Sequence, residues 1–553
     1  ATQQDGRIAN NGATVDLQWD GAWRSAAARL DDRWTVEFEI PFSTLLYPQE
    51  EQRIWRLNFV RIVPRRLETA VWSGPSESVF RVSGFGDLAG IEPPGREEDV
   101  WQFIPYSVGT FEIGDGGHFE FGGDIRWRPS TTLGVDLTVN PDFALVEADV
   151  EEINLTRLEV SVPEKRPFFL EGTEMYDQRY PQFHTRRIGD ITWGAKANGR
   201  LGSTDFSVIT ASEKLRPAGF QEKKPAYFSI FRAQRSLPRG STIGLLATNR
   251  SLAGENVGTV GADSTLYFTD TISFTGQLFR VHGPTADGGL VWFVRPSYDT
   301  STTHFHVRYG RFSPNIRDDL NVLGFLPEDD RKEIDTNFGH TWFGGGLFER
   351  VRGSVNFNYA NSISQNRLRR WSLSPRVTAV LSNNFEFQIE RREEKRGADP
   401  DLRRFTKDFR NRQTKVTAGW NARDGRAVSA YVGGGHIFDN DALEYGGQVQ
   451  WAFGDSLRLL YSVSRLDLTP DLEHESTTIH VFEATYTFNP DLFVRAFVQT
   501  NSAIEKENVQ LLGVWRFNPP FGSFQIAYQR GTSEFGERSE QSDTLFSKLV
   551  WVL

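Results

Sequence analysis

Strict alternation between apolar and charged side chains is the feature that most limits how this chain can fold. It is clearest in residues 118–128, where the two faces carry, respectively, Phe119, Phe121, Ile125 and Trp127, and His118, Glu120, Asp124, Arg126 and Arg128. A period of two predicts a β-strand. A soluble sandwich would not bury charge on one face in strand after strand, whereas a membrane barrel with a wet lumen tolerates charge there.

Similar segments recur from Trp101 to Leu553, each close to the roughly 9–11 residues that cross a bilayer at a tilt. Counting them gives about 24 strands, in a range of about 22–26, with an even number if both ends share a side. We therefore predict an all-β chain in which residues 98–553 form a transmembrane antiparallel β-barrel. The last strand, 544–553, resembles the C-terminal strand read by the outer-membrane insertion machinery, although it ends in Leu553 and not in an aromatic residue.

Composition agrees with a barrel and argues against other classes. The chain has no run of about 18 apolar residues and its mean hydropathy is -0.45, which excludes a helical membrane protein. The absence of cysteine rules out disulfides, thiolate metal sites and a cysteine nucleophile. The 43 Phe and 15 Trp residues suit lipid-facing bands and interfacial girdles. A net charge of -10 argues against a nucleic-acid partner.

Connection lengths test the strand count, because bacterial barrels have short periplasmic turns and longer extracellular loops. With the first hairpin tip, 114–117, taken as extracellular, short turns are expected at 129–130, 200–204, 269–271, 299–302, 381–384, 489–491 and 518–522. Long loops are expected at 140–189, 212–224, 313–333, 393–412, 467–476 and 531–542. This phase places residues 1–97 in the periplasm of a bacterial outer membrane.

The longest interruption carries a family resemblance. VEADVEEINLTRLEVSVPEKRPFFLEG, which ends at Gly172, and HTRRIG at 184–189 resemble a widespread, uncharacterised family of bacterial outer-membrane barrels. In that family a domain similar to carbohydrate-binding module family 9 precedes the barrel. The resemblance implies this architecture, with residues 1–97 as a partial module of that kind. It implies no activity, because none is established for the family.

Residues 140–189 are expected to plug or constrict the lumen, because a barrel near 24 strands otherwise encloses a wide hole. A short helix is expected around 146–158, followed by a turn at 163–172. Two interpretations stay open: a cap anchored by aromatic side chains, and a constriction or gate. The residues assigned to either are Asp142, Glu147, Asp149, Arg157, Glu164, Lys165, Arg166, Phe168, Phe169 and Glu171.

In the N-terminal domain, exposed tryptophans could stack on sugar rings. The candidates are Trp19, Trp23 and Trp72, whereas alternation places Trp34 in the core. The plainer interpretation is that all four are core and edge aromatics of a β-sandwich.

Three patterns suggest chemistry, and each has a plainer explanation. Gly454–Leu457 (GDSL) and the Asp471/His474 pair match fragments of a lipase and esterase motif, but Ser456 and His474 are expected on opposite sides of the membrane. His304, His306 and Arg308 share a strand face and are expected to line the lumen, with metal binding as the rival interpretation. Acidic residues in the loops could hold calcium, although solvated loop charge is the default; they are Asp142, Glu147, Asp149, Asp318, Asp319, Glu328, Asp329 and Asp330.

The prediction for function is therefore a channel or transport-type barrel with a loop-occluded lumen, for carbohydrate or another large polar solute. No catalytic residue, cofactor or metal is assigned. The alternative is a membrane-anchored binding or scaffold protein with a closed barrel, holding a glycan or an envelope protein. Outer-membrane lipid is a partner in both, and nucleic acid in neither.

Overall fold

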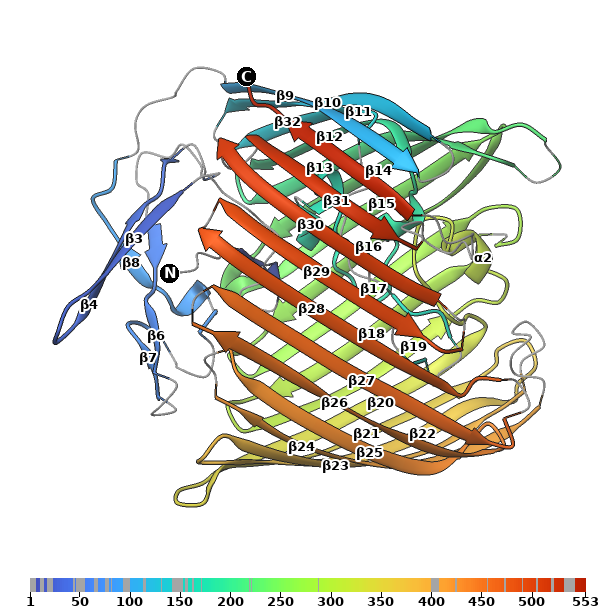
Figure 1. Cartoon of the computed structure of the whole chain (residues 1–553). Coiled ribbons are helices and arrows are strands. Elements are labelled where there is room, and N and C mark those ends of the chain that lie inside the picture. Colours follow the sequence, from blue (N-terminus) through green and yellow to red (C-terminus); the bar gives the residue numbers. More distant parts are fainter. Residues whose placement is uncertain are drawn as a thin grey trace.

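The computed structural model describes the chain except for residues 1–5, 10–13, 17–22, 43–44, 46–54, 64–67, 75–78, 81, 93–99, 113–115, 131, 142–152, 155–157, 162–163, 171, 218, 220, 287, 399–406, 423–424, 455, 472–473, 490, 504–505, 519–521 and 532–542. Strands β9 to β32 form one closed barrel of 24 strands, in which each pairs with its sequence neighbours and β32 closes on β9 (Figure 1). Every pairing in it is antiparallel, so the predicted fold class is confirmed.

The first twelve barrel strands precede the midpoint of the closed sheet. They are β9 (Val100–Glu112), β10 (Gly116–Ser130), β11 (Leu133–Val139), β12 (Ile191–Leu201), β13 (Thr204–Leu215), β14 (Lys224–Ser236), β15 (Thr242–Leu252), β16 (Glu255–Tyr267), β17 (Ile272–His282), β18 (Leu290–Asp299), β19 (Thr303–Phe312) and β20 (Arg331–Phe343). The remaining twelve are β21 (Phe348–Asn361), β22 (Leu368–Leu381), β23 (Phe385–Arg396), β24 (Phe409–Asn421), β25 (Ala427–Ile437), β26 (Asn440–Phe453), β27 (Leu457–Thr469), β28 (Thr477–Asn489), β29 (Leu492–Asn501), β30 (Lys506–Asn518), β31 (Gly522–Arg530) and β32 (Asp543–Val550).

The two faces of the barrel wall differ in the way the alternation requires. On the outer face, large apolar side chains stay exposed around the whole circumference, among them Phe121, Phe231, Val260, Phe305, Val377, Val432, Leu511 and Leu545. The side chains between them form the inner face, which is rich in arginine, glutamate, glutamine and asparagine. An apolar band around a closed barrel is what lipid contact requires. Among the described residues, no helix is long and apolar enough to span a membrane.

Connections fall into two classes at the two ends of the barrel. At one end every turn has two to five residues, from 131–132 to 237–241. At the other end lie the long connections, including 140–190 and 313–330. The phase predicted from the sequence is confirmed, although this end also has two-residue turns at 253–254 and 438–439. Because β9 begins and β32 ends at the short-turn end, the N-terminal strands attach there (Figure 1).

The N-terminal part consists of short strand pairs. They are β1 (Arg7–Ala9) with β2 (Thr14–Asp16), β3 (Arg24–Arg29) with β4 (Trp34–Glu39), β5 (Trp55–Leu57) with β8 (Gly86–Leu88), and β6 (Val60–Val63) with β7 (Glu68–Val71). The prediction that Trp34 lies in a core is wrong, because its side chain is 57% exposed. In the described residues β4 pairs only with β3, and no second sheet covers its apolar face.

In the residues that the structure describes, helical structure is limited to single turns. These are η5 (Val82–Gly84), α1 (Pro167–Leu170), η6 (Thr173–Tyr176), η7 (Thr185–Arg187), η8 (Pro238–Gly240) and α2 (Arg317–Leu320). Most of the helix predicted at 146–158 lies outside the described residues; Ile153, Asn154 and Leu158 are described and are not helical.

Candidate functional site: the segment that crosses the lumen

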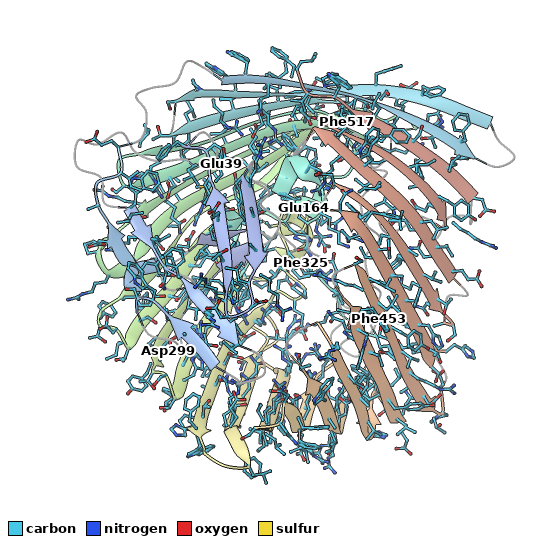
Figure 2. All side chains as sticks on the ribbon, turned by 60° about the vertical axis from the view of Figure 1, so that its left-hand side comes forward. Glu39, Glu164, Asp299, Phe325, Phe453 and Phe517 are labelled. Carbon is cyan, nitrogen blue, oxygen red and sulfur yellow. The ribbon has the colours of Figure 1, made fainter. Side chains whose placement is uncertain are left out.

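The connection between β11 and β12, residues 140–190, contacts the inner face on both sides of the barrel. Ile153 packs against two apolar clusters near the long-loop ends of β24 to β29, and Leu158 packs against the first of them. The clusters consist of Phe409, Ile437, Phe438, Ala442 and Leu466, and of Ile479, Val481 and Phe497. Further along, residues 164–190 pack against β12 to β19. The chain therefore crosses the lumen, and Figure 2 shows Glu164 inside the ring of strands.

Arg166 organises the part of the segment nearest β12. Its guanidinium donates to the carbonyls of Thr185, Ile188 and Gly189 at 2.6–2.8 Å. It also forms a two-pronged ion pair with Glu164, at 2.7 and 2.9 Å. Burial opposes ionisation of Glu164, but the hydrogen bonds and charge of Arg166 outweigh it and lower the carboxyl pKa. The two sequence motifs, 163–172 and 184–189, are thus joined through one buried side chain.

Aromatic packing completes this corner. Phe169 is fully buried, and the guanidinium of Arg166 lies 4.5 Å from its ring centroid. Phe168 lies edge-on to Phe169, and Lys196 of β12 donates to the Phe168 carbonyl at 3.0 Å. Lys165 is half-buried. Burying these rings and a paired arginine holds the corner against the barrel wall.

Polar side chains of the barrel wall bind the next part of the segment, Met175 and Tyr176. The Tyr176 hydroxyl contacts Ser207 of β13 at 2.7 Å, and Arg232 of β14 donates to the Met175 carbonyl at 2.8 Å. Arg232 is almost fully buried and pairs with Asp263 of β16. Burial raises the pKa of Tyr176 strongly, so its hydroxyl stays protonated.

Residues 178–182 follow the wall towards β19. Gln182 donates to Thr259 of β16 at 2.9 Å, and Gln178 donates to Asp263 at 2.7 Å. The Tyr180 ring packs edge-on against Phe293 of β18 and Phe312 of β19. None of these contacts was predicted from the sequence, because they join residues that lie far apart in the chain.

The segment also contacts the long loop 313–330. The His184 amide donates to the Leu323 carbonyl at 2.7 Å, and the Phe325 amide donates to Pro181 at 2.9 Å. Arg187 donates to Gly324 at 3.1 Å. The connections 140–190 and 313–330 therefore contact each other inside the long-loop end of the barrel (Figure 2, where Phe325 is labelled).

The acidic residues of loop 313–330 have partners within the chain. Glu328 pairs with Arg370 and Arg396, while Asp330 accepts hydrogen bonds from Ser362, Ser364 and Arg369. Burial opposes ionisation of Glu328, but the charges of Arg396, Arg370 and Arg331 outweigh it and lower its pKa to about 2.

The other acids of this loop are similarly engaged. Asp319 and Asp329 accept from backbone amides, and Asp318 pairs with Arg317. In the described part of the chain no three acidic or histidine side chains converge to hold a metal ion. Asp319, Glu328, Asp329 and Asp330 therefore anchor the loop, whereas Asp318 is exposed beside Arg317. The calcium interpretation has no support in these five acids. Asp142, Glu147, Asp149, Arg157 and Glu171 lie outside the described residues.

His304 and His306 belong to a hydrogen-bonded chain on the inner face of β18 to β20. Asp299 contacts His304, the His304 Nε2 and His306 Nδ1 atoms are 3.0 Å apart, and His306 contacts Asp335 at 3.2 Å. Arg308 pairs with Glu333 at 2.7 Å. The facing nitrogens of His304 and His306 are therefore hydrogen-bonded along a line and do not converge on a common point.

The remaining candidates are separated. Ser456 precedes β27 and His474 follows it, so the thirteen residues of that strand lie between them. At about 3.3 Å per residue they are roughly 40 Å apart, too far for a nucleophile and its base. Trp72 is exposed and lies edge-on to Phe59, and Trp23 contacts Phe38. Trp19 lies outside the described residues.

Solvent exposure of the inner face differs between the two ends. Towards the long-loop end, inner-face residues of β21 to β28 are buried, as Asn358, Asn411, Ala442 and Val481 are. Towards the short-turn end, the inner-face residues Arg352, Ser429, Gln448 and Arg458 are exposed. On β21 to β28 the inner face is therefore covered near the long-loop end and exposed to solvent near the short-turn end.

Comparisons with known proteins give one partial family match and distant structural matches. Residues 101–214 match the family model described as a domain of unknown function (DUF5916). No match is found among curated proteins. Among solved structures, the Pseudomonas aeruginosa siderophore receptor PirA aligns at 6% identity with a TM-score of 0.38, covering 86% of this chain and 83% of the receptor. The copper transporter OprC aligns at 12% identity with a TM-score of 0.40, covering 85% and 83%. Because both scores are below 0.5, the architecture rests on the strand pairing itself.

Proposed function

We propose that this chain is a transport-type barrel of the bacterial outer membrane whose lumen is occluded by residues 140–190. The observation that carries the proposal is the path of that segment across the lumen. Ile153 packs against β24 to β29 on one side, and Arg166 lies beside β12 on the other. An occluding segment inside an exposed polar inner face is the arrangement expected of a regulated passage. By the usual orientation of such barrels, the long-loop end is extracellular and the N-terminal strands are periplasmic.

The solute is proposed to be polar, and a carbohydrate or another large polar molecule fits best. The accessible inner face presents Ser429, Gln448 and Gln450 beside charged residues, which are groups that hydrogen-bond to hydroxyls. The tryptophans exposed at the short-turn end, Trp34 and Trp72, offer faces on which a sugar ring can stack.

A second candidate is a membrane-anchored binding or scaffold protein. It is favoured by the number of buried polar contacts that hold residues 164–187 in place, because leaving such groups unpaired costs about 1–3 kcal/mol each. In this interpretation the barrel never opens, and the N-terminal strands or long loops hold a glycan or an envelope protein.

Single-channel conductance in planar bilayers separates the two. The intact protein is compared with a variant in which residues 146–172 are replaced by a flexible linker. The matched control shortens 532–541, a connection at the same end of the barrel. Transport predicts silence or rare openings from the intact protein and the control, and large steady currents from the first deletion. If all three are silent while folded, the transport proposal is wrong and the scaffold interpretation replaces it.

A further inference from the structure

One part of the inner face carries an excess of positive charge. Among the described side chains of β27 to β32, the charged ones that point inward are Arg458, Arg495, Arg516, Lys548 and one carboxylate, Glu483. We call this the cationic wall. The inward direction follows from register with Val481 and Phe497, which belong to the cluster that contacts Ile153 of the crossing segment.

Three of these cations, Arg458, Arg495 and Arg516, lie close to Thr485 and Phe493. Arg458 of β27 and Arg495 of β29 are both in register with Thr485 of β28, one on each side of it. The guanidiniums of Arg495 and Arg516 lie 6.0 and 5.9 Å from the centroid of the Phe493 ring. Two strand spacings of about 4.8 Å place Arg458 roughly 10 Å from Arg495.

The cationic wall differs from parts of the inner face where cations pair with carboxylates. Arg376 pairs with Glu390 at 2.6 Å, and Lys415 pairs with Glu444 at 3.3 Å. Among the described residues, by contrast, Arg458 and Arg516 have no carboxylate within ion-pair distance, and Arg458 is exposed. A cationic surface between low-dielectric walls concentrates anions from solution.

We propose that the cationic wall recruits solutes bearing carboxylate, sulfate or phosphate groups into the accessible part of the lumen. Guanidinium forks suit planar and tetrahedral oxyanions, and Phe493 holds two of them in place by cation–π contact. The inference rests on the proposed function, which it deepens by giving the solute a charge.

The absence of cysteine from the chain permits a direct test. Thr485→Cys places a thiol between Arg458 and Arg495, and Ser429→Cys places one on exposed inner face of β25 as a control. Each is modified in detergent by two methanethiosulfonates of similar size, one bearing a sulfonate and one a quaternary ammonium. The anionic-to-cationic rate ratio should be at least about tenfold higher at position 485 than at 429, and 1 M salt should abolish the difference, because the Debye length falls to about 3 Å.

Neutralisation and competition complete the test. In the Thr485→Cys background, Arg458→Gln, Arg495→Gln and Arg516→Gln together should lower the ratio to that at position 429. Inorganic pyrophosphate should slow the reaction of the anionic reagent at position 485, and this protection should saturate with pyrophosphate concentration. In the variant with the three Arg→Gln substitutions the protection should disappear. Equal ratios at the two positions, or a ratio insensitive to the three substitutions, would overturn the inference while leaving the transport proposal standing. If neither reagent reaches position 485 or position 429 in folded protein, the accessible lumen itself is absent and the transport proposal fails first.

Discussion

Gln277 and the backbone of Tyr180 exchange two hydrogen bonds. The Gln277 carboxamide oxygen accepts from the Tyr180 amide at 3.2 Å, and its nitrogen donates to the Tyr180 carbonyl at 2.8 Å. One side chain thus satisfies both polar groups of a buried residue, as a neighbouring strand would. These two bonds fix residues 140–190, called the occluding segment below after the proposed function, to the barrel wall without making them part of the sheet.

Replacing Gln277 should therefore loosen the segment locally. In Gln277→Leu both Tyr180 groups lose their partner, at a cost of about 1–3 kcal/mol, which corresponds to roughly five- to 160-fold faster amide exchange. Hydrogen exchange of the peptide containing Tyr180, followed by mass spectrometry, measures it. Gln448→Leu is the matched control, because Gln448 is an exposed inner-face glutamine. Unchanged exchange at Tyr180 would show that the pairing does not hold the segment.

Arg166 should be the most sensitive single position for occlusion. Arg166→Ala removes the two-pronged partner of buried Glu164, which keeps only Arg186 at 3.9 Å as a cation, and leaves three carbonyls without this donor. Breaking a buried pair costs about 3–5 kcal/mol. We expect frequent openings in planar bilayers where the parent is silent. The neighbouring Lys165→Ala should stay silent. Openings of equal frequency in both variants would contradict a specific role for the Arg166 contacts.

Low pH should weaken the contact between the occluding segment and loop 313–330. Burial and the neighbouring Arg187 lower the pKa of His184 to about 4, below the unperturbed value of 6.5. Because the folded form binds the proton less readily, the contact is strongest above pH 6.5 and weakens as pH falls towards 4. Exchange of residues 181–187, corrected for intrinsic rates, should therefore accelerate over that range.

The variant His184→Gln separates this titration from others nearby. It should show the same exchange at pH 7.5 and at pH 4.5 once intrinsic rates are removed. An unchanged pH response in the variant would show that His184 is not the group responsible.

Access to the lumen should differ between its two ends. Ser429→Cys and Ala442→Cys place near-isosteric thiols on the inner face, on β25 and β26, at an exposed and a buried position. In folded protein we expect a water-soluble maleimide to modify position 429 at least tenfold faster. Replacing residues 146–172 should accelerate position 442, because Ile153 and Leu158 pack against the cluster that contains Ala442. Acceleration of both positions to the same degree would indicate general loosening of the barrel.

Alternation and connection lengths were enough to predict the barrel, because each is a local property of a strand or a turn. Phe119 to Arg128 sets the two faces by period alone. The contacts of the occluding segment are different, since Ile153 meets Ile479 and Tyr180 meets Gln277 across large sequence separations that no local pattern records. Local reasoning also failed at Trp34, where a correct strand assignment said nothing about whether another sheet would cover it.

The lipid-facing band can be tested on a single strand. Val432 of β25 is 52% exposed on the outer face, near the middle of the strand. An arginine at that depth should destabilise the barrel by about 2–4 kcal/mol in a bilayer. Ser429→Arg, three residues away on the inner face, should cost much less, because its charge remains in water. Reversible folding into lipid vesicles, followed by tryptophan fluorescence against urea, gives both values. Equal costs at the two positions would mean that the outer face of β25 is not in contact with hydrocarbon, and the assignment of the barrel to a membrane would lose its physical basis.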